Sequence, residues 1–173
     1  MSGWSEGKIA RAIALQTLAK KCVVLVDRCN WTGHECDVLA VTTDLRIIDV
    51  EVKISRADFK ADAKKDKWWH RMTWGEPGPR QHRPWPPKVW KHYVAMPRDL
   101  WDDALFAFMP SPASGLLLVR EHRGRVEVNC HRRATPNRDA DRISAEQAVD
   151  IARLANLRMW DAYAARERTE VPA

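Results

Sequence analysis

The amino-acid sequence predicts an α/β fold, with a central mixed β-sheet flanked by helices. Short apolar runs rich in β-branched residues alternate with segments of helical periodicity. Their order is one helix, three strands, a second helix and then further strands, which is typical of helices packed on a sheet. A chain of 173 residues is long enough to bury one hydrophobic core. We therefore expect a single domain spanning residues 1–173.

Helices are expected at both ends of the chain. Over residues 5–21, Ser5 is a suitable N-cap, and apolar residues recur at helical spacing from Ile9 to Leu18. Glu6 lies in the first turn, where the helix dipole favours a carboxylate. The last helix is expected to follow a capping box formed by Ser144 and Gln147 and to end near residue 166.

The strands are expected at residues 22–27, 37–41, 47–53, 91–96, 116–121 and 125–130. A tight turn at residues 43–45 joins the second and third strands, and Gly124 supplies the turn between the last two. Side chains alternate along a strand, so Asp49, Glu51 and Lys53 are expected to share one face.

The charged residues of these two neighbouring strands are the first functional candidates. Charge is costly to remove from water, so acids and a lysine within apolar strands require partners. A divalent metal ion and a phosphate would supply them. We therefore hypothesise a phosphodiesterase centre formed by Asp37, Glu51 and Lys53. Asp49 shares the face of Glu51 but lies further along the strand, and we expect a structural partner for it.

A second helix is expected over residues 56–67, after the N-cap Ser55. Its apolar residues make no wide stripe, so we expect it to be largely exposed. Its basic side chains would then be available to solvent or phosphate, and Arg56 and Lys60 are candidates for contacts with nucleic acid.

Residues 68–90 have a different composition, and we call them the Trp/Pro-rich segment. Several prolines exclude a long regular element, while the tryptophans argue against disorder. Aromatic and basic side chains together suit base stacking and phosphate contacts, so Trp74, Arg80 and Trp85 are further candidates for nucleic-acid binding. The alternative is a loop held to the body by its own indole rings.

The composition restricts the compartment and the partners. A net charge of +6 favours an acidic partner such as nucleic acid. No apolar run reaches membrane-spanning length, and the start lacks a secretory signal, so we expect no membrane association and a cytoplasmic location. The cysteines at positions 22, 29, 36 and 130 lie near His34 and His131, but their spacing does not match the usual structural zinc sites. We expect reduced, mostly buried thiols.

The segments 37–41 and 50–62, with the later runs 93–97, 115–119 and 125–128, resemble the PD-(D/E)XK nuclease superfamily. The resemblance is to its MmcB-like branch of DNA repair proteins, which also occurs in phage and mobile elements, and it covers roughly residues 5–135. Two features depart from the pattern: Cys36 stands where the superfamily's name has proline, and the Trp/Pro-rich segment is unusually long.

The resemblance implies a restriction-endonuclease-like core and a set of residue roles. Asp37, Glu51 and the carbonyl of Val52 would hold Mg²⁺ or Mn²⁺. Lys53 would orient the attacking water or stabilise charge on phosphorus, and Glu6 would be an accessory acid.

The function expected from these observations is metal-dependent cleavage of DNA, in repair or in the processing of phage or mobile-element DNA. Two alternatives stay open: a nucleic-acid-binding module of the same fold without catalysis, and a protein-interaction module that uses the Trp/Pro-rich segment. The choice between DNA and RNA rests on the resemblance alone, and a homodimer is also left open.

Overall fold

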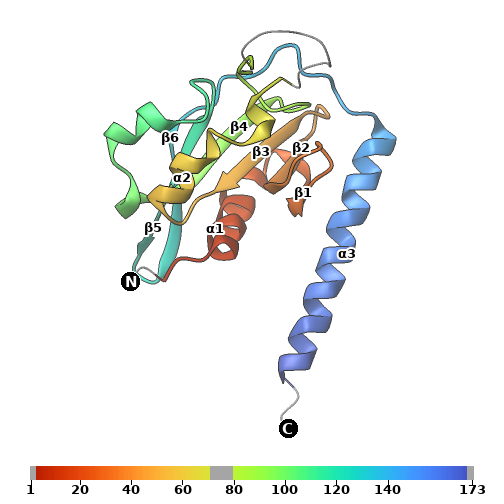
Figure 1. Ribbon diagram of the computed structural model, residues 1–173. Coiled ribbons are helices and arrows are strands. Elements are labelled where there is room, and N and C mark those ends of the chain that lie inside the picture. Colours follow the sequence, from red (N-terminus) through yellow and green to blue (C-terminus); the bar gives the residue numbers. More distant parts are fainter. Residues whose placement is uncertain (1–2, 71–79, 171–173) are drawn as a thin grey trace.

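The computed structural model describes residues 3–70 and 80–170. A six-stranded sheet has the order β1-β2-β3-β4-β5-β6, so each strand lies beside its neighbour in the chain (Figure 1). The strands β3, β4 and β5 run parallel to one another, and the remaining pairs are antiparallel. The bounds are β1 (Cys22–Cys29), β2 (Cys36–Thr42), β3 (Ile47–Val52), β4 (Lys91–Pro97), β5 (Gly115–His122) and β6 (Arg125–Arg132). The predicted α/β fold with a mixed sheet is confirmed.

The helices are α1 (Glu6–Ile13), α2 (Arg56–Asp62) and α3 (Ala145–Glu170). Ser5 caps α1 by accepting a hydrogen bond from the backbone N–H of Lys8, and α1 continues as a π-helical turn over Ala14–Leu18. Short 3₁₀ turns occupy Asp66–Trp68, Arg98–Leu100 and Asp103–Phe108. The last two of these turns lie between β4 and β5.

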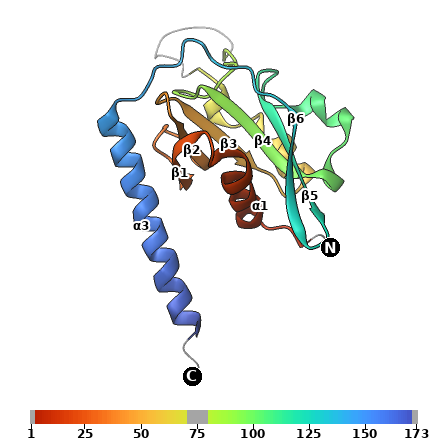
Figure 2. The same ribbon diagram turned by 180° about the vertical axis from the view of Figure 1, so that it is seen from behind.

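Helices cover both faces of the sheet. Figure 1 shows α2 in front of the strands, and Figure 2, from behind, shows α1 in front of them. Ile9 and Ile13 of α1 pack on side chains that point to one face, among them Val38, Val50 and Leu117. On the opposite face, Ile151 of α3 packs with Leu39, Val41 and Ile47, and Phe59 of α2 packs with Val94, Met96 and Leu118.

The helix predicted over residues 56–67 is shorter than expected. Ser55 caps it as predicted, accepting a hydrogen bond from the N–H of Asp58, but α2 ends at Asp62. Residues 63–65 form a turn, and the 3₁₀ turn Asp66–Trp68 leads back to the sheet. Phe59 and Trp68, both fully buried, hold this segment against the sheet.

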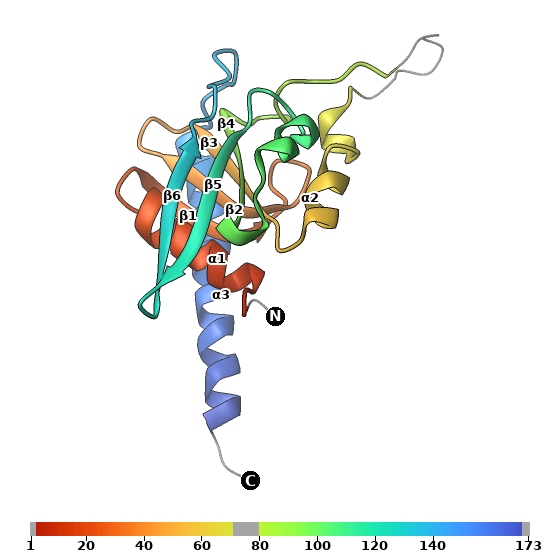
Figure 3. The ribbon, with the colours of Figure 1, turned by 90° about the vertical axis from the view of Figure 1, so that its left-hand side faces the viewer.

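The helix α3 extends well beyond the sheet (Figure 3). Its first turns are anchored by Ala148 and Ile151 in the core, whereas Leu157, Trp160 and Tyr163 are exposed. None of the helices within residues 3–70 and 80–170 is long and apolar enough to cross a bilayer.

Candidate active site

The register of β2 and β3 brings the first two candidate acids together. Val38 pairs with Val50 and Leu39 with Asp49, and the same register places Asp37 opposite Glu51. The Asp37 Oδ2 atom accepts a hydrogen bond of 2.6 Å from the backbone N–H of Val52. Asp37 is therefore fixed to the neighbouring strand, and Val52 contributes its N–H to that bond.

Lys53 joins this pair from the end of β3. Its backbone N–H donates to the carbonyl of Ala95, which places it beside β4. Its ammonium group lies 3.1 Å from Glu51 Oε2 and 2.9 Å from Asp62 Oδ1. Asp58 Oδ1 is 3.8 Å away. Lys53 is thus held between the acid of β3 and the acids of α2.

Two further lysines enter the cluster from the turn after α2. The Lys65 ammonium lies 3.2 Å from Glu51 Oε2 and 2.9 Å from Asp62 Oδ1. Lys67 is buried, and its ammonium binds Glu51 Oε1 and lies 3.6 Å from Asp49 Oδ2. The expectation that the lysines of this region would be available to solvent or phosphate is wrong for Lys67, whereas the Lys65 side chain is 46% exposed although it also reaches the acids. The early end of α2 turns them towards the buried acids.

The electrostatics of the two acids differ. Partial burial and the charge of Glu51 raise the pKa of Asp37 to about 6, and the charge of Glu6 acts in the same direction. Burial alone would also raise the pKa of Glu51, but Lys67 lowers it below its usual range. The negative charge of Asp37 is therefore poorly balanced by nearby positive charge, whereas Glu51 has three lysine ammonium groups beside it.

Lys53 stays charged. Burial alone would lower the pKa of its ammonium, but Asp62 and Glu51 raise it above its usual range. Burial alone would raise the pKa of Asp62, but the charges of Lys67 and Lys53 lower it below its usual range. A lysine held this firmly as an ammonium cannot act as a base, but it can donate hydrogen bonds and stabilise negative charge.

Asp49 lies beside two histidines in addition to Lys67. Its Oδ2 atom lies 3.0 Å from His34 Nε2 and 4.0 Å from His92 Nε2. Burial would raise the pKa of Asp49, yet Lys67 and the His34 hydrogen bond hold it below its usual range. The expected structural pairing of Asp49 is therefore present, with Lys67 as its cation.

The residues expected to bind nucleic acid, as far as the structure describes them, each have a contact within the chain. Arg56 Nε donates to the carbonyl of Leu100, and the Lys60 ammonium lies 4.3 Å from the centroid of the Phe108 ring. Arg80 forms an ion pair of 2.7 Å with Asp66. The Trp85 indole N–H donates to the carbonyl of Thr135. Trp74 lies outside the described residues.

The described ends of the Trp/Pro-rich segment are fastened to the body. Trp69 and His82 form an antiparallel bridge, and the N–H of Arg83 donates to the carbonyl of Trp68. The fully buried Trp68 ring stacks on His82 and meets the edge of His92. For Trp68 and Trp85, the observed contacts are those of a loop held by its indoles.

Sequence reasoning missed three members of the cluster, namely Asp62, Lys65 and Lys67, and it considered His34 only beside the cysteines. The three on the α2 segment were hidden because their sequence context reads as a continuous, solvated helix. Lys65 and Lys67 are two residues apart, a spacing that places side chains on one side of an extended chain and not of an α-helix. This spacing was the signal in the sequence that the helix ends before them.

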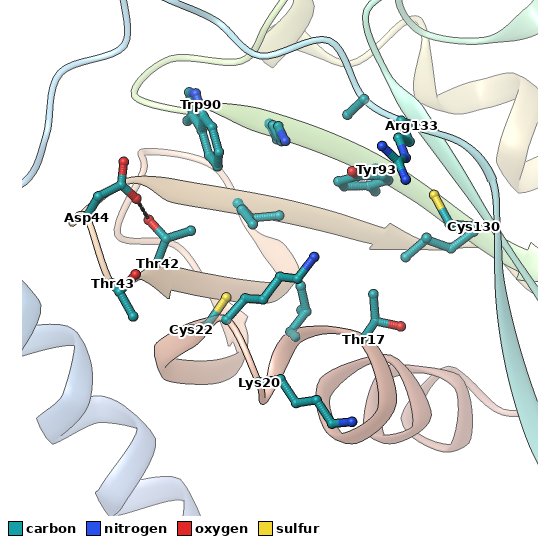
Figure 4. A pocket seen from close by; sticks show the side chains of 16 residues that line it. Thr17, Lys20, Cys22, Thr42, Thr43, Asp44, Trp90, Tyr93, Cys130 and Arg133 are labelled. Carbon is teal, nitrogen blue, oxygen red and sulfur yellow. Dashed lines mark hydrogen bonds between the residues drawn. The ribbon is translucent and has the colours of Figure 1, made fainter.

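The acid cluster and the pocket on the α1 face of the sheet do not coincide. A pocket of about 710 Å³ lies between the sheet and the π-helical turn after α1 (Figure 4). Lys20, Trp90, Tyr93 and Arg133 line it, and so do Ile48 and Leu117 of the face on which α1 packs. Asp37, Glu51 and Lys53 do not line this pocket. We therefore place the candidate active site at the charged cluster and not in this pocket.

The donor set of the cluster suits a hard divalent cation. Such cations take carboxylate oxygens, and Asp37 and Glu51 supply them on adjacent strands. A cation would relieve the repulsion that raises the pKa of Asp37. Both oxygens of Glu51 are bound by lysines. Binding of a metal ion would require the Lys65 ammonium to move away from Glu51, and the Lys65 side chain is 46% exposed.

Comparisons with known proteins support the fold alone. No protein-family model and no curated protein matches the chain. A solved structure, the SPO1766 protein of unknown function from Silicibacter pomeroyi, is similar over 99% of this chain and 98% of its own, with a TM-score of 0.58 and 20% identity. The similarity thus extends over nearly the whole of both chains and supports the overall fold.

Proposed function

We propose that this chain is a metal-dependent nuclease that hydrolyses phosphodiester bonds in DNA. The observation that carries the proposal is the meeting of Asp37, Glu51 and Lys53 at the adjoining ends of β2 and β3. These are the residues that the resemblance to the PD-(D/E)XK superfamily assigns to catalysis. Two hard oxygen donors beside a permanently charged ammonium form a set suited to binding a phosphate through a cation.

Each residue has a distinct role in this proposal. Asp37 and Glu51 would hold Mg²⁺ or Mn²⁺, together with the carbonyl of Val52. When bound, the ion would polarise the phosphoryl oxygen and lower the pKa of a water molecule. Lys53 would orient that water or stabilise negative charge on phosphorus. Asp62 would keep Lys53 in place, since it lies 2.9 Å from the ammonium.

Glu6 belongs to the proposal as an accessory acid. It is exposed at the start of α1, and its charge contributes to the raised pKa of Asp37. That influence supports a position close enough to affect the centre, in addition to its favourable place in the first turn of a helix.

The enzyme assay uses the purified full chain with Mg²⁺ or Mn²⁺ on linear, nicked and single-stranded DNA, with RNA in parallel. We expect cleavage that a chelator abolishes, and a loss of at least about 100-fold in Asp37→Asn and Lys53→Met. Lys64→Met is the matched control, because Lys64 is an exposed lysine near the same helix. Equal cleavage by the wild type and the two centre variants would identify a contaminant and reject the proposal.

One observation favours a second candidate, a nucleic-acid-binding module of the same fold without catalysis. Lys53, Lys65 and Lys67 already neutralise Glu51, in the place where a cation would act. Under this alternative, cleavage is absent, DNA affinity falls steeply with salt because counterions are released, and Asp37→Asn binds as well as the wild type.

The remaining parts of the proposal concern the cell and the partners. We propose a cytoplasmic location, supported by four free cysteines, which suit a reducing compartment. A role in DNA repair or in phage or mobile-element DNA processing rests on the sequence resemblance. A homodimer and a protein partner for the Trp/Pro-rich segment are left as secondary hypotheses.

A further inference from the structure

A second group of metal-ligating side chains lies beside the proposed centre, on the other side of Lys67. His34, Cys36 and Asp49 each offer one ligand atom, and the three atoms lie within 4.8 Å of one another. His34 Nε2 is 3.0 Å from Asp49 Oδ2 and 3.7 Å from Cys36 Sγ. Tetrahedral zinc with bonds of about 2.0 to 2.3 Å separates its ligands by roughly 3.2 to 3.7 Å. These two separations fall close to that range.

Two buried polar atoms at this place have no hydrogen-bond partner within the described part of the chain. They are Asp49 Oδ1 and His92 Nε2. Both residues are completely buried, and His92 Nε2 lies 4.0 Å from Asp49 Oδ2. The other ring nitrogen of His92 is bonded to Ser114 Oγ at 2.8 Å, which fixes the ring with Nε2 towards the carboxylate. An unpaired acceptor in such a position is costly, and a cation would satisfy it.

The charges around the group also fit a divalent ion. Zn²⁺ bound to one thiolate and one carboxylate is neutral overall, and the nearby Lys67 is balanced by Glu51. On binding, the Cys36 thiol would lose its proton to solvent, and the sulfur would become a metal ligand. His34 opens onto a hollow lined by Thr32, Lys65 and Trp69, which provides a path for the ion.

We propose that His34, Cys36 and Asp49 form a binding site for Zn²⁺ or a similar transition-metal ion, with His92 Nε2 facing its fourth position. The site ties the loop before β2 to the middle of β3. It differs from the proposed catalytic centre in its donors, because thiolate and imidazole select zinc-like ions, whereas carboxylates alone suit Mg²⁺.

Cobalt is the probe for this site, because thiolate ligation to Co²⁺ produces a charge-transfer absorption that oxygen ligands do not. The full chain, stripped with a chelator, is titrated with Co²⁺ and then with Zn²⁺. We expect one equivalent of Co²⁺ with the thiolate band, displaced by Zn²⁺. The band should vanish in Cys36→Ser and persist in Cys29→Ser, which changes another buried cysteine.

Two more variants keep the test decisive. His34→Gln, at a partly exposed loop position, should retain the fold by circular dichroism and weaken Co²⁺ binding by at least about 10-fold. Asp37→Asn should keep the band unchanged, so a failure of the proposed nuclease centre is distinguishable from a failure of this site. A wild-type chain without the thiolate band, or a band that survives in Cys36→Ser, would overturn the proposal.

Discussion

At the scale of single residues, Asp37 is the acid of the proposed centre whose negative charge has the least support from its surroundings. Glu51 has three lysine partners, whereas Asp37 has one backbone hydrogen bond and the charge of Lys53 against burial and two nearby acids that repel it. An acid of this kind destabilises the folded protein when ionised, and the destabilisation marks a place where a cation would be bound favourably.

This imbalance predicts an unusual pH dependence of stability. The pKa of Asp37 is about 6 in the folded protein and about 3.9 in an unfolded chain. Between these values the folded state binds more protons, so the contribution of Asp37 to stability falls as pH rises. In chelator, Asp37→Asn should therefore melt at a higher temperature than the wild type at pH 8. Its advantage should shrink towards pH 4.

Asparagine can still accept the hydrogen bond from the Val52 N–H, so the comparison isolates the charge. Asp99→Asn, at an exposed position, is the control and should shift melting little at either pH. A variant at position 37 that is less stable than the wild type at pH 8 would mean that the ionised carboxylate is net favourable.

At the scale of elements, the decisive feature is the segment from the end of α2 to Trp68. The chain leaves the helix at Asp62, turns, and returns to the sheet, where Lys67 and Trp68 are buried. Trp68 also donates its indole N–H to Asp62 at 3.3 Å. This return supplies the charges that allow Glu51 and Asp49 to remain ionised in the interior.

Removing Lys67 should therefore be costly. Lys67→Met leaves Glu51 and Asp49 without their closest shared cation, and breaking a buried pair in this way costs about 3 to 5 kcal/mol. Lys64→Met should change the free energy of unfolding by less than about 0.5 kcal/mol. Urea denaturation measures both.

The double variant Glu51→Gln/Lys67→Met tests the cause of that loss. It should recover part of the stability lost in Lys67→Met, because one buried charge is removed with its partner. If no recovery occurs, the loss comes from packing of the lysine stem and not from the unpaired acids.

The sequence predicted much of this arrangement, and its failures have physical causes. The shared face of Asp49, Glu51 and Lys53 follows from the period-two alternation of side chains along any strand. The end of α2 at Asp62 could not be predicted in this way, because residues 63–67 have the composition of a solvent-exposed helix. Tertiary contacts of Phe59 and Trp68 override that preference. His34 was set aside because the spacing of cysteines and histidines was compared with local zinc motifs, whereas Asp49 joins it across strands.

At the scale of the whole molecule, the sheet is covered unevenly. Near the sheet, α3 contributes Ala148, Ile151 and Ala155 to one core cluster. Arg158 still reaches the body, donating to the carbonyl of Arg28 at 2.8 Å. Further along, Trp160 and Tyr163 contact each other and are exposed. The stabilising contribution of α3 is therefore concentrated in its first half.

Paired substitutions along α3 test this division. Ile151→Ala should destabilise the protein by about 2 to 5 kcal/mol, because it opens a cavity in a fully buried site. Trp160→Ala should cost less than about 0.5 kcal/mol despite the larger side chain removed. Thermal and urea unfolding compare the two. A large loss in Trp160→Ala at low protein concentration would contradict the exposed position of this residue.

The strand order has a consequence for how the protein is made. Every strand pairs with the strand synthesised just before it, so the sheet can grow at one edge as the chain emerges. The antiparallel pairs are joined by short connections, whereas the parallel pairs β3–β4 and β4–β5 need longer crossovers, which close more slowly. Asp37, Glu51, Lys53, Asp62 and Lys67 all precede β4 in the chain. All the charged residues of the cluster are thus synthesised before the strand that completes this side of the sheet beside β3.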